Sequence, residues 1–275
     1  MDFADKLLEA VERNQSLVCV GLDPDPELMP RMRPFDFNKA IIDVTSDLVC
    51  AYKPNLAFYE ALGVEGLTAL QQTVDYIPDD IPVIGDAKRG DIGNTARAYA
   101  KALFETLGFD AATVNPYLGY DSIEPFINYR DKAVFILCRT SNAGALDFQA
   151  LTYWSGGPDS KQEPLFKLVA QKAKEWNKNN NIGLVVGATC PEELKEIRQL
   201  CPEMTLLIPG IGAQGGGLDS AVRYGVDAEG KKAIFSSSRQ ILYASKGSDF
   251  ALAARRAADE LRCRINSLLP GSSAT

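Results

Sequence analysis

The sequence of 275 residues contains no histidine. Histidine is the commonest general base in enzymes, the commonest metal ligand and the usual partner of a nucleophilic serine or cysteine. Its absence excludes all of these arrangements. Any chemistry that this chain performs must therefore depend on lysine, arginine, aspartate, glutamate and hydroxyl groups.

Long apolar runs and a secretory signal are absent as well. No stretch of about 18 consecutive apolar residues occurs, so no segment has the length of a membrane-spanning helix. The first six residues, Met-Asp-Phe-Ala-Asp-Lys, lack the basic and then apolar pattern of a signal peptide. We therefore expect a soluble, cytoplasmic protein that does not contact a membrane.

Paired cysteine motifs are also missing. The six cysteines are scattered without a C-x-x-C pair, and several lie in apolar runs. This spacing favours reduced, buried thiols over a disulfide framework or a zinc site. The cysteines are Cys19, Cys50, Cys138, Cys190, Cys201 and Cys263.

Positive charge is in deficit, with 29 basic residues against 36 acidic ones and a formal net charge of -7. A protein that binds nucleic acid without sequence preference needs a basic face that neutralises phosphates. We therefore expect no nucleic-acid partner. A phosphate bound by this chain should be small and held locally.

What the sequence does contain is a regular alternation of short apolar runs with helical patterns. Continuous apolar strands separated by helices predict parallel βαβ units, and eight units predict a single-domain (β/α)8 TIM barrel over residues 1–269. An open, doubly wound sheet would show the same alternation. Residues 270–275 have the composition of a disordered tail. The expected strands are 17–22, 48–53, 81–88, 111–115, 133–139, 182–187, 205–209 and 232–236, and clear helical patterns cover 38–47, 66–76, 95–107, 164–177 and 191–200.

Polar residues follow the apolar strands, where both folds place their functional sites. Asp86 and Lys88 are two apart at a strand end, so they should project from the same face. The simpler alternative is that Asp91 caps a helix while Asp86 pairs with a solvent-exposed Lys88. Lys53 ends another strand and favours an alternating array, in which ammonium groups stay protonated and carboxylates stay ionised. The remaining polar strand ends are Asp23, Asn115, Arg139, Gln214 and Arg239.

A second candidate site consists of two segments that follow the seventh and eighth predicted strands. Residues 209–217 are rich in glycine, and residues 236–239 read Ser-Ser-Ser-Arg. In TIM barrels these loops commonly bind phosphate through backbone N–H groups and one cation. Tight turns alone would also explain the glycines. Arg239 at the expected position favours the phosphate site, whose candidate members are Pro209, Gln214, Gly216, Ser238 and Arg239.

One connection is unusually long. Residues 142–163 contain Trp-Ser-Gly-Gly-Pro and show no clear period. Such a segment is either a lid or an excursion over the surface.

The run Asp-Ala-Lys-Arg-Gly-Asp-Ile-Gly-Asn-Thr, residues 86–95, resembles the signature of the orotidine 5'-monophosphate decarboxylases, in the branch that carries Ala-Lys-Arg-Gly. Further motifs in the same order extend the resemblance over nearly the whole chain. These motifs are Gly-Leu-Asp-Pro at 21–24, Tyr-Lys-Pro-Asn at 52–55, Arg-Thr-Ser-Asn at 139–142, the glycine-rich loop from 209 and Arg239.

The resemblance implies a role for each matching residue. Lys53, Asp86, Lys88 and Asp91 correspond to the charged catalytic array, with Lys88 as the group that protonates C6 of the pyrimidine. It further implies that Asp91 and Thr95 enter the site of the neighbouring subunit in a homodimer. Asp23 matches a ribose contact and Ser141 a contact to the pyrimidine edge. Gln214 and Arg239 match phosphate ligands.

The implied reaction is the loss of CO2 from orotidine 5'-monophosphate to give UMP, the last step of de novo pyrimidine synthesis, with no metal and no organic cofactor. One alternative is a magnesium-dependent barrel enzyme that acts on a sugar phosphate, such as a hexulose-phosphate synthase or a keto-gulonate-phosphate decarboxylase. Another is a non-catalytic barrel that binds a phosphorylated metabolite.

Overall fold

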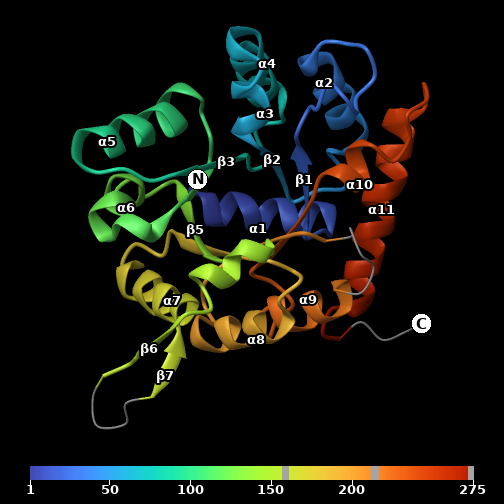
Figure 1. Ribbon diagram of the computed structural model, residues 1–275. Helices are drawn as coiled ribbons and strands as arrows, with labels where there is room; N and C mark the ends of the chain where they lie inside the picture. The colour runs from blue at the N-terminus through green and yellow to red at the C-terminus, as the bar shows by residue number, and fades with distance from the viewer. Residues whose placement is uncertain (157–160, 212–216, 272–275) are drawn as a thin grey trace.

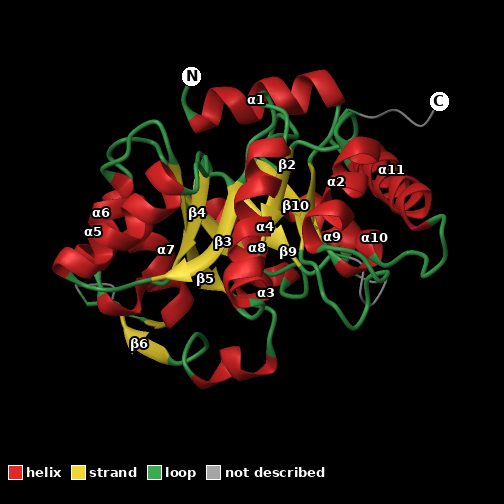
Figure 2. Ribbon diagram, turned by 90° about the horizontal axis from the view of Figure 1, so that it is seen from above, coloured by secondary structure: helices red, strands yellow, loops and turns green. Residues whose placement is uncertain are grey.

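In the computed structural model, the described residues are 1–156, 161–211 and 217–271. Within them, eight parallel strands form one sheet that curves into a barrel surrounded by helices (Figures 1 and 2). The spatial order is β2-β1-β10-β9-β8-β5-β4-β3, so successive strands of this sheet are neighbours in the barrel and the first strand, β1, pairs with the last, β10. The strands are β1 (Val18–Leu22), β2 (Ala51–Pro54), β3 (Ile84–Arg89), β4 (Ala111–Val114), β5 (Ala133–Arg139), β8 (Ile182–Val186), β9 (Leu206–Pro209) and β10 (Ala233–Ser237).

The barrel closes between β2 and β3. Two isolated parallel bridges, Tyr52 with Val83 and Asn55 with Asp86, join these strands, and the Tyr52 N–H donates to the Pro82 carbonyl at 3.0 Å. The predicted (β/α)8 barrel is therefore confirmed, and the open-sheet alternative is wrong. The bridge at Asp86 also brings the polar ends of β2 and β3 side by side.

Helices connect the strands and cover the outside of the barrel (Figure 1). Each predicted helical pattern is found as a helix with slightly shifted ends, and residues 95–107 divide into α5 and a π-helical turn, η1. The helices are α1 (Phe3–Asn14), α2 (Pro34–Thr45), α3 (Leu56–Glu60), α4 (Gly63–Tyr76), α5 (Gly93–Lys101), η1 (Ala102–Thr106), η2 (Pro116–Leu118), α6 (Tyr120–Ile127), η3 (Ala143–Asp147), α7 (Leu165–Trp176), α8 (Pro191–Leu200), α9 (Leu218–Gly225), α10 (Arg239–Leu242) and α11 (Phe250–Leu268).

Helix α1 lies across the N-terminal end of the barrel (Figure 2). Its buried positions Phe3, Leu7 and Ala10 recur at helical spacing and form one apolar face. The Phe3 ring packs edge-to-face on Phe135 of β5, with ring centroids 5.8 Å apart. The Lys6 Nζ lies 2.7 Å from a carboxylate oxygen of Asp110. Helix α1 thus closes one end of the barrel and leaves the opposite end open.

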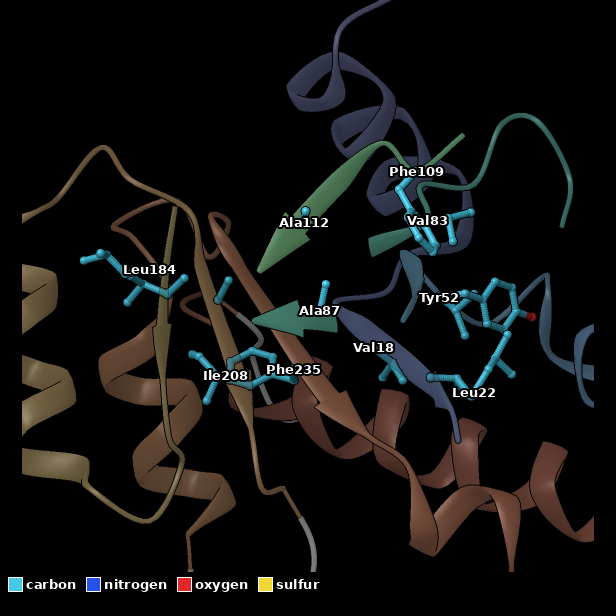
Figure 3. Packing of buried hydrophobic residues seen from close by; sticks show 14 of the residues in the cluster. Val18, Leu22, Tyr52, Val83, Ala87, Phe109, Ala112, Leu184, Ile208 and Phe235 are labelled. Atoms are coloured by element: carbon cyan, nitrogen blue, oxygen red, sulfur yellow. The ribbon is translucent and has the colours of Figure 1, made fainter. Parts of the chain in front are cut away.

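Alternate residues of each strand pack on opposite sides of the barrel wall, as β1 illustrates. Val18, Val20 and Leu22 belong to the large core between wall and helices, where Figure 3 shows Val18 and Leu22 beside Tyr52. Cys19 belongs instead to a smaller apolar cluster with Ile84 and Phe135 that fills the barrel interior. Both faces of the strands are therefore buried, which explains their continuous apolar sequences.

The long segment 142–163 contains the short helix η3 and a two-stranded hairpin, β6 (Thr152–Trp154) and β7 (Gln162–Pro164). The hairpin projects from the barrel beside α7 (Figure 1), and the Tyr153 hydroxyl lies 3.3 Å from Gln171 of that helix. Residues 157–160 at the turn lie outside the described residues. The two interpretations drawn from the sequence, a lid or an excursion over the surface, both stay predictions.

All six cysteines are free, and only Cys263 is exposed, as the scattered spacing predicted for most of them. None of the helices in the described ranges is long and apolar enough to cross a membrane. Of the predicted disordered tail, 270–275, residues 272–275 lie outside the described part.

Arg198 of α8 holds together the segments that lead into β9 and β10. Its guanidinium is buried, pairs with no carboxylate of the described residues, and donates to backbone carbonyls at the ends of α8 and α9 and before both strands. Burial lowers the pKa of Arg198 to about 10, with the nearby Asp227 charge opposing this shift. The strands that carry the candidate phosphate loops thus begin at fixed positions.

Replacing Arg198 with methionine should lower the free energy of unfolding by about 3 kcal/mol, because several buried carbonyls lose their donors. Urea denaturation measures this difference. The matched control is Arg256→Met on α11, whose side chain is 63% exposed and should change stability by less than about 0.5 kcal/mol. Equal stability of the two variants would contradict the role assigned to Arg198.

Candidate active site

Two lysines share one carboxylate at the open end of the barrel. The Lys53 Nζ at the end of β2 lies 2.8 Å from Asp86 Oδ2, and the Lys88 Nζ lies 2.6 Å from Asp86 Oδ1. Lys53 and Asp86 are only 5% and 9% exposed, whereas the Lys88 side chain is 49% exposed. The predicted proximity of these three residues is therefore found, with Lys88 as the member that a ligand can reach.

The charges of this cluster stabilise one another. Burial by itself raises the pKa of Asp86, but the charges of Lys53 and Lys88 and their hydrogen bonds outweigh burial and hold that pKa well below its usual range. Burial likewise lowers the pKa of Lys53, but the nearby carboxylates of Asp86 and Asp23 raise it above its ordinary value. At neutral pH the buried pair is thus fully ionised.

Asp23 lies beside the cluster, as expected from its position after β1. It is buried, and one carboxylate oxygen accepts a hydrogen bond from the Asn55 N–H at 3.2 Å. The Tyr243 hydroxyl donates to the Asp23 carbonyl at 2.6 Å and accepts from the Asp25 N–H at 2.8 Å. The loop after β1 therefore has a fixed conformation. Asp23 lies close enough to Lys53 for its negative charge to raise the pKa of that lysine.

Thr113 of β4 is part of the same site, although the sequence analysis did not select it. Its hydroxyl donates to Asp86 Oδ1 at 2.9 Å and accepts from the Lys88 N–H at 2.9 Å. The available signal was a single hydroxyl within the apolar run Ala-Ala-Thr-Val. Such residues are common in strands, so this signal alone could not have identified Thr113.

A pocket of about 830 Å³ lies at the ends of β9 and β10, and Arg239 of the candidate phosphate site lines it. Ser141, Gly210 and Arg239 all contribute to its wall, so the structure brings together residues that are far apart in the sequence. Arg239 is the first residue of α10, and its side chain is exposed. Gln214 and Gly216 lie outside the described residues.

Pro209 and Ser238 occupy neighbouring strand ends beside this pocket. Pro209 ends β9 and pairs with Ser236 of β10. Ser238 packs so closely on Gly21 of β1 that a Cβ built at residue 21 would lie 1.9 Å from the serine Oγ. Glycine at position 21 is therefore required by close packing at the mouth of the barrel.

The structure of the single chain does not bring every predicted residue into the cluster. In the described ranges, no hydrogen bond or ion pair joins Asp91 to Lys53, Asp86 or Lys88, and its carboxylate accepts the Ile92 N–H at 2.8 Å. Thr95, at the start of α5, is exposed to solvent. Both residues thus lie at the surface of the chain.

Two other polar strand ends serve local structure. Arg139 points away from the barrel interior toward Glu193 of α8, with 3.3 Å between guanidinium and carboxylate. A register shift in β5 between Leu137 and Arg139 accounts for this direction. Asn115 accepts the Tyr117 N–H at 3.1 Å and so caps η2. Among the described residues, no group of three or more cysteine, aspartate or glutamate side chains is arranged to hold a metal ion.

Comparison with known proteins agrees with this geometry. The model of the orotidine 5'-phosphate decarboxylase/HUMPS family matches residues 16–254. The chain belongs to this family. It is 54% identical over 268 residues to the orotidine 5'-phosphate decarboxylase of Dehalococcoides mccartyi, which covers 97% of this chain and 98% of that protein. It is 53% identical over 263 residues to the protein of the same name from Herpetosiphon aurantiacus, covering 93% and 95% of the two chains.

A solved structure supports the same assignment. The OMP decarboxylase of Leishmania donovani superposes with a TM-score of 0.84 at 41% identity over 98% of both chains. The family and the enzyme class that the sequence motifs predicted, a carboxy-lyase, are thus confirmed. The individual roles of the site residues remain predictions.

Asp86→Asn should lower the free energy of unfolding by about 3 kcal/mol at pH 7, because Lys53 would remain buried without its partner. The folded-state pKa of Asp86 lies below its unfolded value. The pair therefore stabilises the protein fully above the ordinary aspartate pKa of about 4, and this contribution is lost as the pH falls further. Urea denaturation of both proteins from about 1.5 pH units below that pKa to about 4 units above it measures the effect.

The difference in the free energy of unfolding between wild type and Asp86→Asn should be constant near neutral pH and should become smaller in acid. A difference that does not change with pH would mean that the charge of Asp86 does not contribute to stability. Asp79→Asn, at an exposed position, is the control and should leave stability unchanged at every pH.

Proposed function

We propose that this chain converts orotidine 5'-monophosphate to UMP with release of CO2, as the last step of de novo pyrimidine synthesis and without a metal or organic cofactor. The observation that carries the proposal is the alternation of Lys53, Asp86 and Lys88 at the open end of the barrel. This arrangement supplies an exposed ammonium group, held by a buried counter-ion, in a chain without histidine. The names of the relatives support this substrate.

In the proposed reaction the bond between C6 and the substrate carboxylate breaks, CO2 leaves and the electron pair stays at C6. The ammonium of Lys88 stabilises this developing charge and then gives its proton to C6, which forms the C–H bond of UMP. Lys88 regains a proton from water. Asp86 holds the ammonium in position, and Lys53 keeps Asp86 from turning away from the site.

The phosphate would bind at the pocket beside β9 and β10. Arg239 contributes a charge suited to a phosphate, and Pro209, Gln214, Gly216 and Ser238 would contact the same group. Asp23 would bind the ribose hydroxyls and Ser141 the edge of the pyrimidine. Ser141 and Arg239 line one pocket, which supports their action on a single ligand. Binding energy from the distant phosphate would help to hold C6 beside Lys88.

We further propose that the enzyme is a homodimer in which Asp91 and Thr95 complete the partner's site. Both residues lie at the surface, without a bond to their own cluster in the described ranges. Two large apolar side chains nearby are exposed. Ile92, which follows Asp91, is 57% exposed, and Tyr117, in the loop after β4, is 80% exposed. A second copy would cover these side chains and bring its Asp91 to the lysines.

Lys88→Ala should lower kcat by about 10³-fold or more, since it removes both the proton donor and the stabilising charge. The loss of orotate absorbance measures turnover. Lys178→Ala, at an exposed position before β8, is the control and should keep full activity. Wild-type activity should also survive a metal chelator. Abolition by the chelator, restored by magnesium, would instead support the alternative of a magnesium-dependent sugar-phosphate enzyme.

Mixing the inactive variants Lys88→Ala and Asp91→Ala should restore activity. Random exchange of subunits produces mixed dimers with one intact site each, or about a quarter of the wild-type sites. The matched control mixes Lys88→Ala with Asp86→Ala, whose defects both lie in the subunit's own share of the site, and should stay inactive. If exchange is verified and the first mixture is also inactive, Asp91 does not act across an interface.

A further inference from the structure

We infer that Thr113 is a positioning residue, which holds the Lys88 backbone directly and the Lys88 ammonium group through Asp86 in the geometry needed for proton transfer. This inference rests on the proposed function of Lys88 as the proton donor. Thr113 lies on β4, next to β3, and is only 1% exposed. A ligand therefore cannot reach its hydroxyl, so any contribution of Thr113 must act through its two neighbours.

The backbone at Lys88 departs from a regular strand. Its φ of 47° lies in the left-handed region, which is unfavourable for a residue with a Cβ. The register between β3 and β4 shifts between Gly85 and Arg89, so the ladder of main-chain bonds is interrupted at this position. The Lys88 N–H donates instead to the side-chain hydroxyl of Thr113 at 2.9 Å. Beyond it the ladder resumes, with the Asn115 N–H donating to the Arg89 carbonyl at 2.8 Å.

The direction of both hydrogen bonds of Thr113 is determined by chemistry. A backbone N–H can only donate, so the Thr113 oxygen accepts from Lys88. The ionised carboxylate of Asp86 can only accept, so the hydroxyl proton points to Oδ1 at 2.9 Å. One hydroxyl thus bridges the backbone of Lys88 and the carboxylate that binds the same lysine's ammonium group.

This bridge also assigns the two oxygens of Asp86. Oδ1 receives the Thr113 hydroxyl and the Lys88 Nζ, whereas Oδ2 receives the buried Lys53 Nζ. The carboxylate cannot rotate about its last bond without losing one of these partners. Thr113 therefore limits the freedom of the carboxylate that sets the position of the Lys88 ammonium.

Valine has nearly the shape of threonine but no hydroxyl. In Thr113→Val the Lys88 N–H loses the acceptor that supports its left-handed conformation, and Asp86 loses a donor. The ammonium should move from its reacting position, while Arg239 and Asp23 keep their places. The rate of the chemical step should therefore fall more than the affinity for the substrate.

The experiment compares Thr113→Val and Thr113→Ser with the wild-type enzyme. For the valine variant, kcat should fall by about 10²-fold, since a small misplacement of a reacting group has an effect of this size. The KM and the affinity for UMP should change by less than about threefold, because uniform binding is preserved. Serine keeps the hydroxyl and should restore kcat to within about tenfold of wild type. A crystal structure of the valine variant should show Lys88 outside the left-handed region.

Thr73→Val is the matched control. Thr73 is a buried threonine of α4 whose hydroxyl bonds to Asn38, away from the site. The Thr73→Val variant loses a buried hydroxyl that does not contact Lys53, Asp86 or Lys88. The kcat of this variant should therefore equal that of wild type, even if its melting temperature falls.

Three results would overturn the inference: a wild-type kcat for Thr113→Val, a rise in KM alone, or failure of serine to improve on valine. If the wild-type enzyme does not act on orotidine 5'-monophosphate, the proposed function fails. The conformation of Lys88 in the variant then decides the positioning role by itself, and an unchanged left-handed backbone refutes it.

Discussion

The carboxylate of Asp86 is the group on which the site and much of the barrel's open end depend. A buried ammonium such as that of Lys53 is strongly destabilising unless a counter-ion compensates for its lost hydration. Asp86 provides that charge, and it does so from the strand at which the barrel closes. The fold places these charges at the end of the interior opposite α1, where one member of the array, Lys88, is accessible.

The rest of the interior makes this arrangement rigid. Below the charged cluster, Cys19, Ile84 and Phe135 fill the barrel with apolar side chains, and α1 closes its base. Tightly packed surroundings that exclude water hold a charged group in one orientation, so it does not have to reorient during the reaction. Electrostatic stabilisation is most effective under these conditions. Arg198 has a comparable role at the other end of β9 and β10, where it fixes the segments that lead to the phosphate loops.

Strand β3 shows how a functional position departs from the regular sheet. A regular parallel ladder would direct the Lys88 N–H to the backbone of β4 and keep this residue in an extended conformation. Here a side-chain hydroxyl replaces the backbone acceptor, and the lysine adopts a left-handed conformation. Such local strain persists only where surrounding contacts determine it, and it is concentrated at functional sites.

Local sequence patterns were sufficient to predict the parallel α/β class of the fold and most of the charged cluster. Runs of apolar residues buried on both faces identify parallel strands, and residues two apart at a strand end, such as Asp86 and Lys88, must share a face. Side-chain direction beyond such local periodicity depends on pairing between strands. For this reason three features became evident from the folded chain: Thr113 faces Asp86, a register shift turns Arg139 toward Glu193, and α1 covers the barrel base. These contacts join segments far apart in the chain, and no local pattern encodes which partner a side chain meets.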